Sequence, residues 1–273
     1  MISASIVLYN TPVDQLKAII DCYKPSRCRL LFLIDNSPSK SDYCIALSES
    51  NEYVLYLYNG SNLGYGAAHN IAIERAIDEN SKYHIVINPD ISFEDGVIEQ
   101  LIEYADNNLD VVYILPKVIY PDGRTQYLCK LLPTPSDLLF RRFFSSFGFA
   151  KKRNDIYTLK NSGYNRIINP PCLSGCFMFL RVSTLVTSGI RFDDRFFMYC
   201  EDFDIIRRLH RVGKTIYYPM VEIKHDHANE SYKTKRMLMI HIGSAIKYFN
   251  KYGWFFDSER RTMNKKILNE LES

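Results

Sequence analysis

Three carboxylates, Glu201, Asp202 and Asp204, follow directly on the apolar and aromatic run 196–200. A buried apolar run fixes the backbone and leaves the carboxylates at its end, where a pocket can open. A carboxylate in such a place can have its pKa shifted and can accept a proton from a hydroxyl group. Acidic side chains also favour the first turn of a helix, so a structural interpretation stays open. For Asp204 it is favoured, because Asp204 and Arg208 form an i, i+4 pair.

Two further apolar runs end in side chains that can bind a metal ion or a phosphate group. Asn88-Pro89-Asp90 follows one run, and His225-Asp226-His227 follows the other. A strand would place both histidines on one face, but no third spaced histidine or cysteine completes a zinc site. Asn-Pro-Asp is also a common turn sequence. A lone histidine is more often structural than a ligand, and the His-Asp-His spacing after an apolar run makes the two interpretations about equal. Three runs that each end in polar side chains nevertheless predict one shared site.

The elements that must position these side chains begin with short apolar runs that alternate with helical patterns. The expected strands are residues 4–8, 30–34, 53–57, 84–87 and 111–115, with apolar residues at helical spacing over 13–20 and 67–72. Strands alternating with helices predict an α/β fold, in which helices cover both faces of a parallel sheet.

Polar residues follow the first four expected strands, at positions 9–10, 35–36, 59–66 and 88–90. Each short sequence taken alone can be a turn, because asparagine, aspartate, glycine and proline favour turns. The carboxyl ends of parallel strands share one edge of the sheet, however, and ligands bind at that edge. Four polar sequences along it predict a crevice for a nucleotide.

The rest of the chain is organised differently. Residues 131–153 are basic and aromatic without a clean helical period, and we expect them to be irregular. Residues 202–212 predict a helix that stops at Gly213, and residues 233–252 predict a terminal amphipathic helix. Because no repeat or low-complexity linker interrupts the sequence, we expect one domain over residues 1–232 and a C-terminal helical extension over 233–273.

The composition limits the class of protein. With 34 basic and 31 acidic residues the net charge is +3, which does not support a nucleic-acid-binding protein. The seven cysteines include no Cys-x-x-Cys pair, which favours reduced thiols in the cytoplasm over disulfides. The amino terminus lacks the basic segment of a signal peptide, and no apolar run approaches the roughly 20 residues of a membrane span. We expect a cytoplasmic protein, either soluble or peripheral on the inner face of the cell membrane.

The motifs, taken in order, resemble those of inverting family-2 glycosyltransferases with the GT-A fold, over residues 3–232. The resemblance rests on Tyr9-Asn10, Asp35-Asn36-Ser37, the stretch Asn62 to Asn70, Asn88-Pro89-Asp90, Ser174-Gly175-Cys176, Glu201-Asp202-Phe203-Asp204 with Arg208, and Tyr218-Pro219 with His225. Within the family, the sequence is most similar to bacterial rhamnosyltransferases of O-antigen or capsule assembly, which use dTDP-L-rhamnose.

The resemblance implies a Rossmann-like, mostly parallel sheet flanked by helices. Residues 1–115 would bind the nucleotide sugar, and residues 116–232 would bind the acceptor and carry catalysis. The reaction would move a sugar, L-rhamnose in the narrower match, with inversion onto a hydroxyl of a saccharide acceptor that is lipid-linked. In the family the aspartate of the Glu-Asp pair is the general base, which assigns that role to Asp202. Glu201 would orient the acceptor or share the proton.

The resemblance also implies a divalent cation, Mg²⁺ or Mn²⁺, that neutralises the departing diphosphate. The family usually offers Asp-x-Asp for this ion. Here Asn88 stands at the first position, so Asp90 is the only carboxylate of the motif. His225 matches the place where related enzymes have a histidine that contacts the metal or the diphosphate, and His227 lies two residues on.

The remaining predicted site residues bind the donor. Asp35 and Asn10 are expected near the base and the ribose, and Gly64 and Gly66 would let the backbone approach the nucleotide at the start of a helix. Each of these also has an ordinary interpretation as part of a loop or helix cap. The predicted donor-binding set is Tyr9, Asn10, Asp35, Asn62, Gly64, Gly66, Asn70, Asn88, Asp90, Ser174 and Gly175.

Other functions compete with this one. A family-2 transferase of another nucleotide sugar, such as a UDP-hexose, fits the same motifs, and a non-catalytic nucleotide-sugar-binding module fits most of them. A sugar-phosphate nucleotidyltransferase would show a glycine-rich basic loop where this chain has Tyr9-Asn10-Thr11-Pro12. A processive polysaccharide synthase would show membrane spans and a Gln-x-x-Arg-Trp motif, but the single tryptophan is Trp254. The sequence indicates no oligomeric state.

Two segments combine basic and apolar side chains in a way typical of proteins that bind membrane surfaces. The first, residues 131–153, interleaves phenylalanines with Arg141, Arg142, Lys151, Lys152 and Arg153. The second is the predicted helix 233–251. A buried aromatic core with a solvated basic rim explains the same pattern, so both interpretations stay open.

Overall fold

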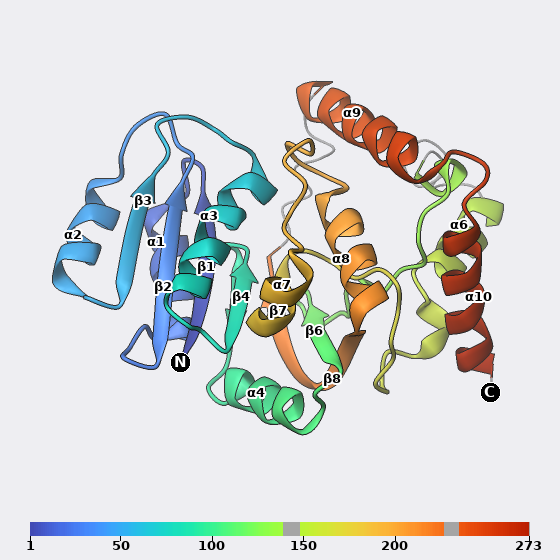
Figure 1. Cartoon of the computed structure of the whole chain (residues 1–273), viewed down its shortest axis with the longest axis horizontal. Coiled ribbons are helices and arrows are strands. Elements are labelled where there is room, and N and C mark those ends of the chain that lie inside the picture. Colours follow the sequence, from blue (N-terminus) through green and yellow to red (C-terminus); the bar gives the residue numbers. More distant parts are fainter. Residues whose placement is uncertain (139–147, 227–234, 273) are drawn as a thin grey trace.

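A computed structural model of the chain describes residues 1–138, 148–226 and 235–272. Within these residues, eight strands form one sheet in the order β3-β2-β1-β4-β7-β6-β8-β5 (Figure 1). The strands are β1 (Ile2–Leu8), β2 (Arg29–Asp35), β3 (Val54–Tyr58), β4 (Tyr83–Ile87), β5 (Ile91–Phe93), β6 (Val111–Ile119), β7 (Phe177–Arg181) and β8 (Lys214–His225). The helices are α1 (Val13–Tyr23), α2 (Asp42–Ser50), α3 (Tyr65–Asp78), α4 (Val97–Asn107), α6 (Gly148–Tyr157), the 3-10 turn η1 (Lys160–Ser162), α7 (Val182–Ser188), α8 (Glu201–Val212), α9 (Lys235–Tyr252) and α10 (Ser258–Glu272).

Most strand pairs are parallel. β1 pairs with β2 and β4, β2 with β3, and β6 with β8, all in parallel. β7 is antiparallel to both β4 and β6, and β5 is antiparallel to β8. The predicted α/β fold with a mostly parallel sheet flanked by helices is therefore confirmed, and all five predicted strands are present.

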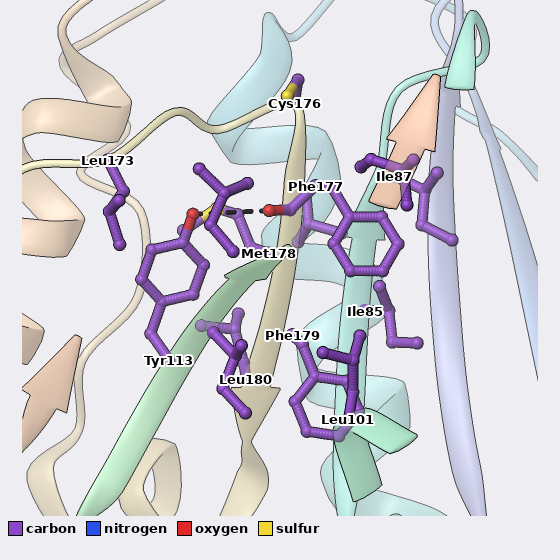
Figure 2. Packing of buried hydrophobic residues seen from close by; sticks show 14 of the residues in the cluster. Ile85, Ile87, Leu101, Tyr113, Leu173, Cys176, Phe177, Met178, Phe179 and Leu180 are labelled. Carbon is purple, nitrogen blue, oxygen red and sulfur yellow. Dashed lines mark hydrogen bonds between the residues drawn. The ribbon is translucent and has the colours of Figure 1, made fainter. Parts of the chain in front are cut away.

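The middle of the sheet is buried along its whole length. Every residue of β4 and β7 is buried, as expected for strands whose two faces are both covered. Figure 2 shows Ile85 and Ile87 of β4 beside Phe177 and Phe179 of β7, with Leu101 of α4 below them. These central strands form a rigid base for the polar turns that follow them.

Helix α3 packs closely on β1 and β2. Its small residues Ala68 and Ala72 belong to a buried cluster with apolar side chains of β2. The hydroxyl of Ser5 in β1 lies 2.7 Å from Nδ1 of His69, and both residues are fully buried. Burial lowers the pKa of His69 well below its usual value, so the imidazole is neutral. These contacts fix α3, whose first residue, Tyr65, reaches the polar edge of the sheet.

Helix α9 lies beside α8, above it in Figure 1, and Glu259 at the start of α10 pairs with Arg207 and Arg211 of α8. Phe203 of α8 forms a buried cluster with Tyr248 and Phe249 of α9. The predicted helix 233–252 is confirmed from residue 235 on as α9, but it is not the terminal helix, because α10 follows it. The division of the chain at residues 232 and 233 stays a prediction. Among the described helices, none is long and apolar enough to cross a bilayer.

The prediction that residues 131–153 are irregular is wrong for the end of the segment that the structure describes. Helix α6 begins at Gly148 and continues to Tyr157. Alanine, lysine and arginine within it favour a helix, a signal that the preceding phenylalanines obscured. Residues 139–147 of the predicted segment lie outside the described part of the chain.

Candidate active site

The predicted catalytic pair lies at the first turn of α8. Tyr199 and Cys200, just before it, both have left-handed backbone angles, with φ of 67° and 64°. Side chains other than glycine adopt this conformation only where their surroundings hold it, at a cost of about 1–3 kcal/mol each. Here the preceding segment is held from two sides: the Tyr65 amide donates to the Phe197 carbonyl at 2.9 Å, and the Ser244 hydroxyl donates to the Met198 carbonyl at 2.7 Å. The strained turn directs Glu201 and Asp202 into the site.

The two carboxyl groups differ in environment. Oε2 of Glu201 is buried and has no hydrogen-bond partner among the described residues. Burial and the nearby charge of Asp202 raise the pKa of Glu201 well above its usual value. Burial also raises the pKa of Asp202, but the Lys130 ammonium and the Phe203 amide oppose the rise, and that amide donates to Oδ1 of Asp202 at 2.9 Å. Asp202 is therefore the member of the pair whose negative charge is better stabilised.

The turn Ser174-Gly175-Cys176 lies directly against Asp202. A Cβ atom at Gly175 would come 3.1 Å from Cβ of Asp202, so glycine is the residue that fits closely there. Tyr113 of β6 supports this turn, since its hydroxyl donates to the Ser174 carbonyl at 2.7 Å. The structure thus brings the predicted residues Ser174 and Gly175 next to the predicted base.

The Asn88-Pro89-Asp90 turn lies on the other side of Gly175. The Tyr65 hydroxyl is 2.8 Å from the Gly175 carbonyl and 3.0 Å from Oδ1 of Asn88. The Asn88 amide donates to the Cys176 carbonyl at 2.9 Å. A continuous series of contacts therefore joins the Asn-Pro-Asp turn to the catalytic pair.

His225 faces Asp90 because β5 and β8 pair in register, with Ile91 opposite His225. Nε2 of His225 lies 3.4 Å from Oδ1 of Asp90. On the other side of the ring, Nδ1 lies 3.0 Å from Oε1 of Gln126, and the Gln126 amide group donates to the His225 carbonyl at 2.8 Å. Burial lowers the pKa of His225, but Cys176 and the Asp90 carboxylate raise it, to about 10.

Asp90 and His225 could supply some of the ligands of a divalent cation, but not a complete set. Gln126 holds the imidazole as outer partners of metal-binding histidines do, with Nε2 facing the carboxylate. Oδ1 of Asp90 is buried without a hydrogen bond from the described residues. No group of three or more histidine, cysteine or acidic side chains that could hold a metal occurs in the described part of the chain. The protein therefore offers one oxygen and one nitrogen, and a bound ion would need oxygens of the diphosphate as well; His227 lies outside the described residues.

The predicted residues around the nucleotide lie at the carboxyl ends of β1 and β2. Asp35 is buried, and its two oxygens accept hydrogen bonds from the Ser37 amide at 2.8 Å and the Tyr56 hydroxyl at 2.5 Å. The Asn10 amide donates to the Ser37 hydroxyl at 2.8 Å, and Tyr9 beside it is exposed. Asp35 thus holds Ser37 and Tyr56 in place at this edge of the sheet. Its contact with a nucleotide stays a prediction.

The stretch from Asn62 to Asn70 has a different close neighbour from the one expected. A Cβ atom at Gly64 would overlap the Phe197 carbonyl oxygen, and one at Gly66 would come 2.8 Å from Cβ of Phe192. The Asn70 side chain donates to the Phe192 carbonyl and accepts from its amide, both at 2.9 Å. These residues bind the segment before α8, so the glycines are required for packing against protein; a role in donor binding stays a prediction.

Three residues of the site were not predicted from the sequence. Lys130 is buried near Asp202, Gln126 supports His225, and Tyr65 joins two turns. A lysine inside the apolar run 128–132 was a usable signal for Lys130. Gln126 and Tyr65 carry no such signal, because their partners are more than twenty residues away.

Comparison with known proteins identifies the family. Residues 3–184 match the model of glycosyl transferase family 2, a range that ends before α8. An N-acetylglucosaminyl-diphospho-decaprenol L-rhamnosyltransferase of Mycobacterium tuberculosis is 30% identical over 189 residues, which are 65% of this chain and 60% of the relative. The rhamnosyltransferase WbbL of Escherichia coli is 28% identical over 200 residues, 70% of this chain and 71% of the relative. The chain thus spans less than two thirds of the mycobacterial relative.

Solved structures share the fold at low sequence identity. The structure of GalNAc-T7 with UDP, GalNAc and Mn²⁺ is 14% identical and aligns with a TM-score of 0.62 over 93% of this chain and 50% of its own. Staphylococcus aureus TarS residues 1–349 in complex with UDP is 13% identical, with a TM-score of 0.57 over 98% of this chain and 71% of its own. Taken with the polar edge described above, these matches establish that the chain belongs to glycosyltransferase family 2 and has the GT-A fold.

Proposed function

We propose that the protein transfers L-rhamnose from dTDP-L-rhamnose, with inversion, onto a hydroxyl of a lipid-linked saccharide. The observation that carries the proposal is the position of Gly175, which contacts Asp202 on one side and shares Tyr65 with Asn88 on the other. A base and a diphosphate-binding turn are thereby held on either side of one small residue. Inverting transfer needs this arrangement, because the attacking and leaving oxygens lie on opposite sides of the anomeric carbon.

In the proposed reaction Asp202 accepts the proton of the acceptor hydroxyl as its oxygen bonds to the anomeric carbon. The bond from that carbon to the diphosphate breaks, and the nucleoside diphosphate leaves with the electron pair. Glu201, held neutral by burial, donates a hydrogen bond to the acceptor and does not compete for its proton. The pair thus divides the work between one charged and one neutral carboxyl group.

Asp90 and His225 are proposed to hold Mg²⁺ or Mn²⁺ at the diphosphate. Such an ion neutralises the negative charge that gathers on the leaving group. The GalNAc-T7 structure, a neighbour in fold, contains Mn²⁺ and UDP. The loss of the first carboxylate of the motif, at Asn88, leaves the ion more dependent on the diphosphate here.

Rhamnose as the donor sugar is supported by the names of the mycobacterial and Escherichia coli relatives. A lipid-linked acceptor is supported by the diphospho-decaprenol in the first of those names. We also propose that residues 1–115 bind the nucleotide and that residues 116–232 bind the acceptor and carry catalysis. The alternative donor is a UDP-hexose.

An acceptor of this kind is confined to a membrane, and the C-terminal helices have a surface that suits one. Met239, Ile242 and Ile246 are exposed on α9, and Phe255 and Phe256, in the connection to α10, are 75% and 86% exposed. Between residues 235 and 272, the exposed charged side chains are mostly basic. Six are basic, namely Lys235, Arg236, Lys247, Arg261, Lys265 and Lys266, and two are acidic, namely Glu270 and Glu272. We propose that this surface rests on the anionic inner face of the cell membrane.

The test of the proposed function is a panel of nucleotide sugars. Purified protein is incubated with dTDP-L-rhamnose, UDP-glucose, UDP-galactose and UDP-N-acetylglucosamine, with and without Mg²⁺, and nucleotide release is measured with a saccharide acceptor. Release from dTDP-L-rhamnose alone supports the proposal. A preference for a UDP-hexose would show that this sugar nucleotide, and not dTDP-L-rhamnose, is the donor. If every donor is bound and none is consumed, the chain is a binding module.

A further inference from the structure

Lys130 is the only lysine among the buried side chains of the described residues, with 9% of its surface exposed. Its backbone amide donates to the Cys172 carbonyl at 2.8 Å, which fixes the residue beside α8. Its ammonium lies 5.2 Å from the centre of the Phe203 ring, at the turn that carries Asp202. A charged side chain therefore enters the candidate site from a segment to which no motif belongs.

No carboxylate of the described residues forms an ion pair with this ammonium, which acts on Asp202 only through the longer-range attraction of the two charges. The buried arginines differ in this respect: Arg207 has Asp257 and Glu259, Arg260 has Asp257 nearby, and Arg181 donates to the carbonyls of neighbouring loops. Burying a cation without a partner costs several kcal/mol, and the Phe203 ring offsets only about 1–2 kcal/mol of it. An unpaired buried cation beside a catalytic base is the arrangement expected where a ligand supplies the anion.

The position of Lys130 indicates that the anion it binds belongs to the acceptor and not to the donor. Inverting transfer places the base and the leaving diphosphate on opposite sides of the anomeric carbon. Lys130 lies near Asp202, on the side of the base. Asp90 and His225 form a separate pair on the side of the diphosphate. An acceptor sugar that carries a diphosphate has its phosphates one ring away from the hydroxyl that attacks.

We infer that Lys130 binds a phosphate of the acceptor, a saccharide linked through diphosphate to a lipid. A lysine suits this role, because its ammonium is a compact charge with three donors that phosphate oxygens can accept. The inference rests on the proposed function and adds to it a residue that distinguishes diphosphate-linked acceptors from neutral ones. Phosphate could also come from the donor, and the experiment separates the two sources.

The experiment compares two acceptors in wild type and in Lys130→Met, which keeps the apolar stem but removes the charge. One acceptor is N-acetylglucosaminyl diphosphate with a short alkyl chain, and the other is the neutral octyl glycoside of N-acetylglucosamine. Rates are measured at alkaline pH, where Asp202 is ionised in both proteins. We expect KM for the diphosphate acceptor to rise about tenfold or more, the usual effect of losing a charged hydrogen bond, while KM for the neutral acceptor and for the donor stays within about twofold. Lys130→Arg should restore part of the affinity.

Lys214→Gln is the matched control, because Lys214 is an exposed lysine paired with Asp110 far from the site. An equal loss with both acceptors would overturn the inference and assign Lys130 to the support of Asp202. A rise confined to the donor KM would assign it to the donor phosphates. Binding of the diphosphate acceptor to wild type and variant without donor, measured by calorimetry, is independent of turnover. A protein that binds this acceptor through Lys130 but consumes no nucleotide sugar would contradict the proposed function and leave the inference standing.

Discussion

Arg207 of α8 donates two parallel hydrogen bonds to Asp257, at 2.7 and 2.8 Å, and both side chains are buried. Asp257 lies between α9 and α10, outside the range that matches the family model. The same guanidinium stacks 4.0 Å from the centre of the Tyr252 ring, whose hydroxyl donates to Asp204 at 2.6 Å. Helix α8, which carries the predicted catalytic pair, is therefore attached to the C-terminal helices by buried charges.

Breaking this attachment should destabilise the protein. Asp257→Ala leaves Arg207 buried with only part of its charge compensated, so we expect a loss of about 3 kcal/mol in the free energy of unfolding. Urea denaturation followed by circular dichroism measures it. Asp95→Ala is the control, because it removes an exposed pair with Lys24, and its denaturation midpoint should match wild type. Equal midpoints for both variants would show that the buried pair adds nothing to stability.

Asp202→Asn should abolish most of the turnover. The amide keeps the size of the side chain but cannot accept the proton, and loss of a general base costs about a hundredfold or more. Donor affinity, measured by calorimetry with the nucleotide diphosphate, should be unchanged. Near-normal turnover in this variant would move the role of base to Glu201.

The rate should fall at acid pH. Because burial raises the pKa of Asp202, the midpoint of the acid limb of kcat should lie above about 4, the ordinary value for aspartate. The base is active above this midpoint and is lost as pH falls through it. Glu201→Gln should leave the midpoint in place, since Glu201 is already neutral. A midpoint that moves in this variant would show that Glu201 carries charge in the active enzyme.

Metal removal should reduce donor binding. Asp90→Ala takes away the only carboxylate of the motif and should weaken donor affinity in the presence of Mg²⁺ or Mn²⁺, with His225→Ala having a smaller effect. Affinity is measured with and without EDTA for each variant and for Gln126→Ala, which keeps Asp90 and His225 but loses the hydrogen bonds of Gln126 to the imidazole and to the His225 carbonyl. Full activity of wild type in EDTA would exclude the metal-dependent mechanism.

The protein should bind anionic vesicles in a salt-sensitive way through its C-terminal surface. Phe255→Ser with Phe256→Ser should reduce co-sedimentation with phosphatidylglycerol-containing vesicles at low salt, because exposed aromatic rings insert at the interface. Leu109→Ser is the control, since Leu109 is 78% exposed between α4 and β6. Equal binding by wild type and all variants would show that the C-terminal surface does not contribute to membrane binding. The basic residues 141 and 142, which the sequence also suggests, lie outside the described residues.

The sequence predicts the first half of the fold well, because there each apolar run is a parallel strand and the polar sequences lie at the carboxyl ends of these strands. It predicts less of the second half. β7 enters the sheet between β4 and β6 in the antiparallel direction, and no local pattern records which neighbours a strand has. His225 meets Asp90 only through the register of β5 with β8.

The candidate site also contains residues that the sequence predicts and residues that it does not. Asp90 follows β4 and Gly175 precedes β7, which runs antiparallel to β4, so both lie at one edge of the sheet, where Gly175 packs against Asp202. Lys130 and Gln126 escaped prediction, since their roles depend on long-range packing. A lysine within an apolar run is the one local sign that a buried charge is present.

The close approach of Gly64 to Phe197 changes how mutagenesis of this enzyme has to be interpreted. A side chain at position 64 would overlap the Phe197 carbonyl and so disturb the segment that leads to α8 and to Asp202, the proposed base. Inactivity of a Gly64→Ala enzyme is therefore no measure of nucleotide contact, and a library that randomises residues 62–70 to change donor choice would mostly sample misplaced bases. Selection for a new donor has a better starting point at Tyr9, which is exposed at the same edge and whose side chain forms no hydrogen bond with the other described residues.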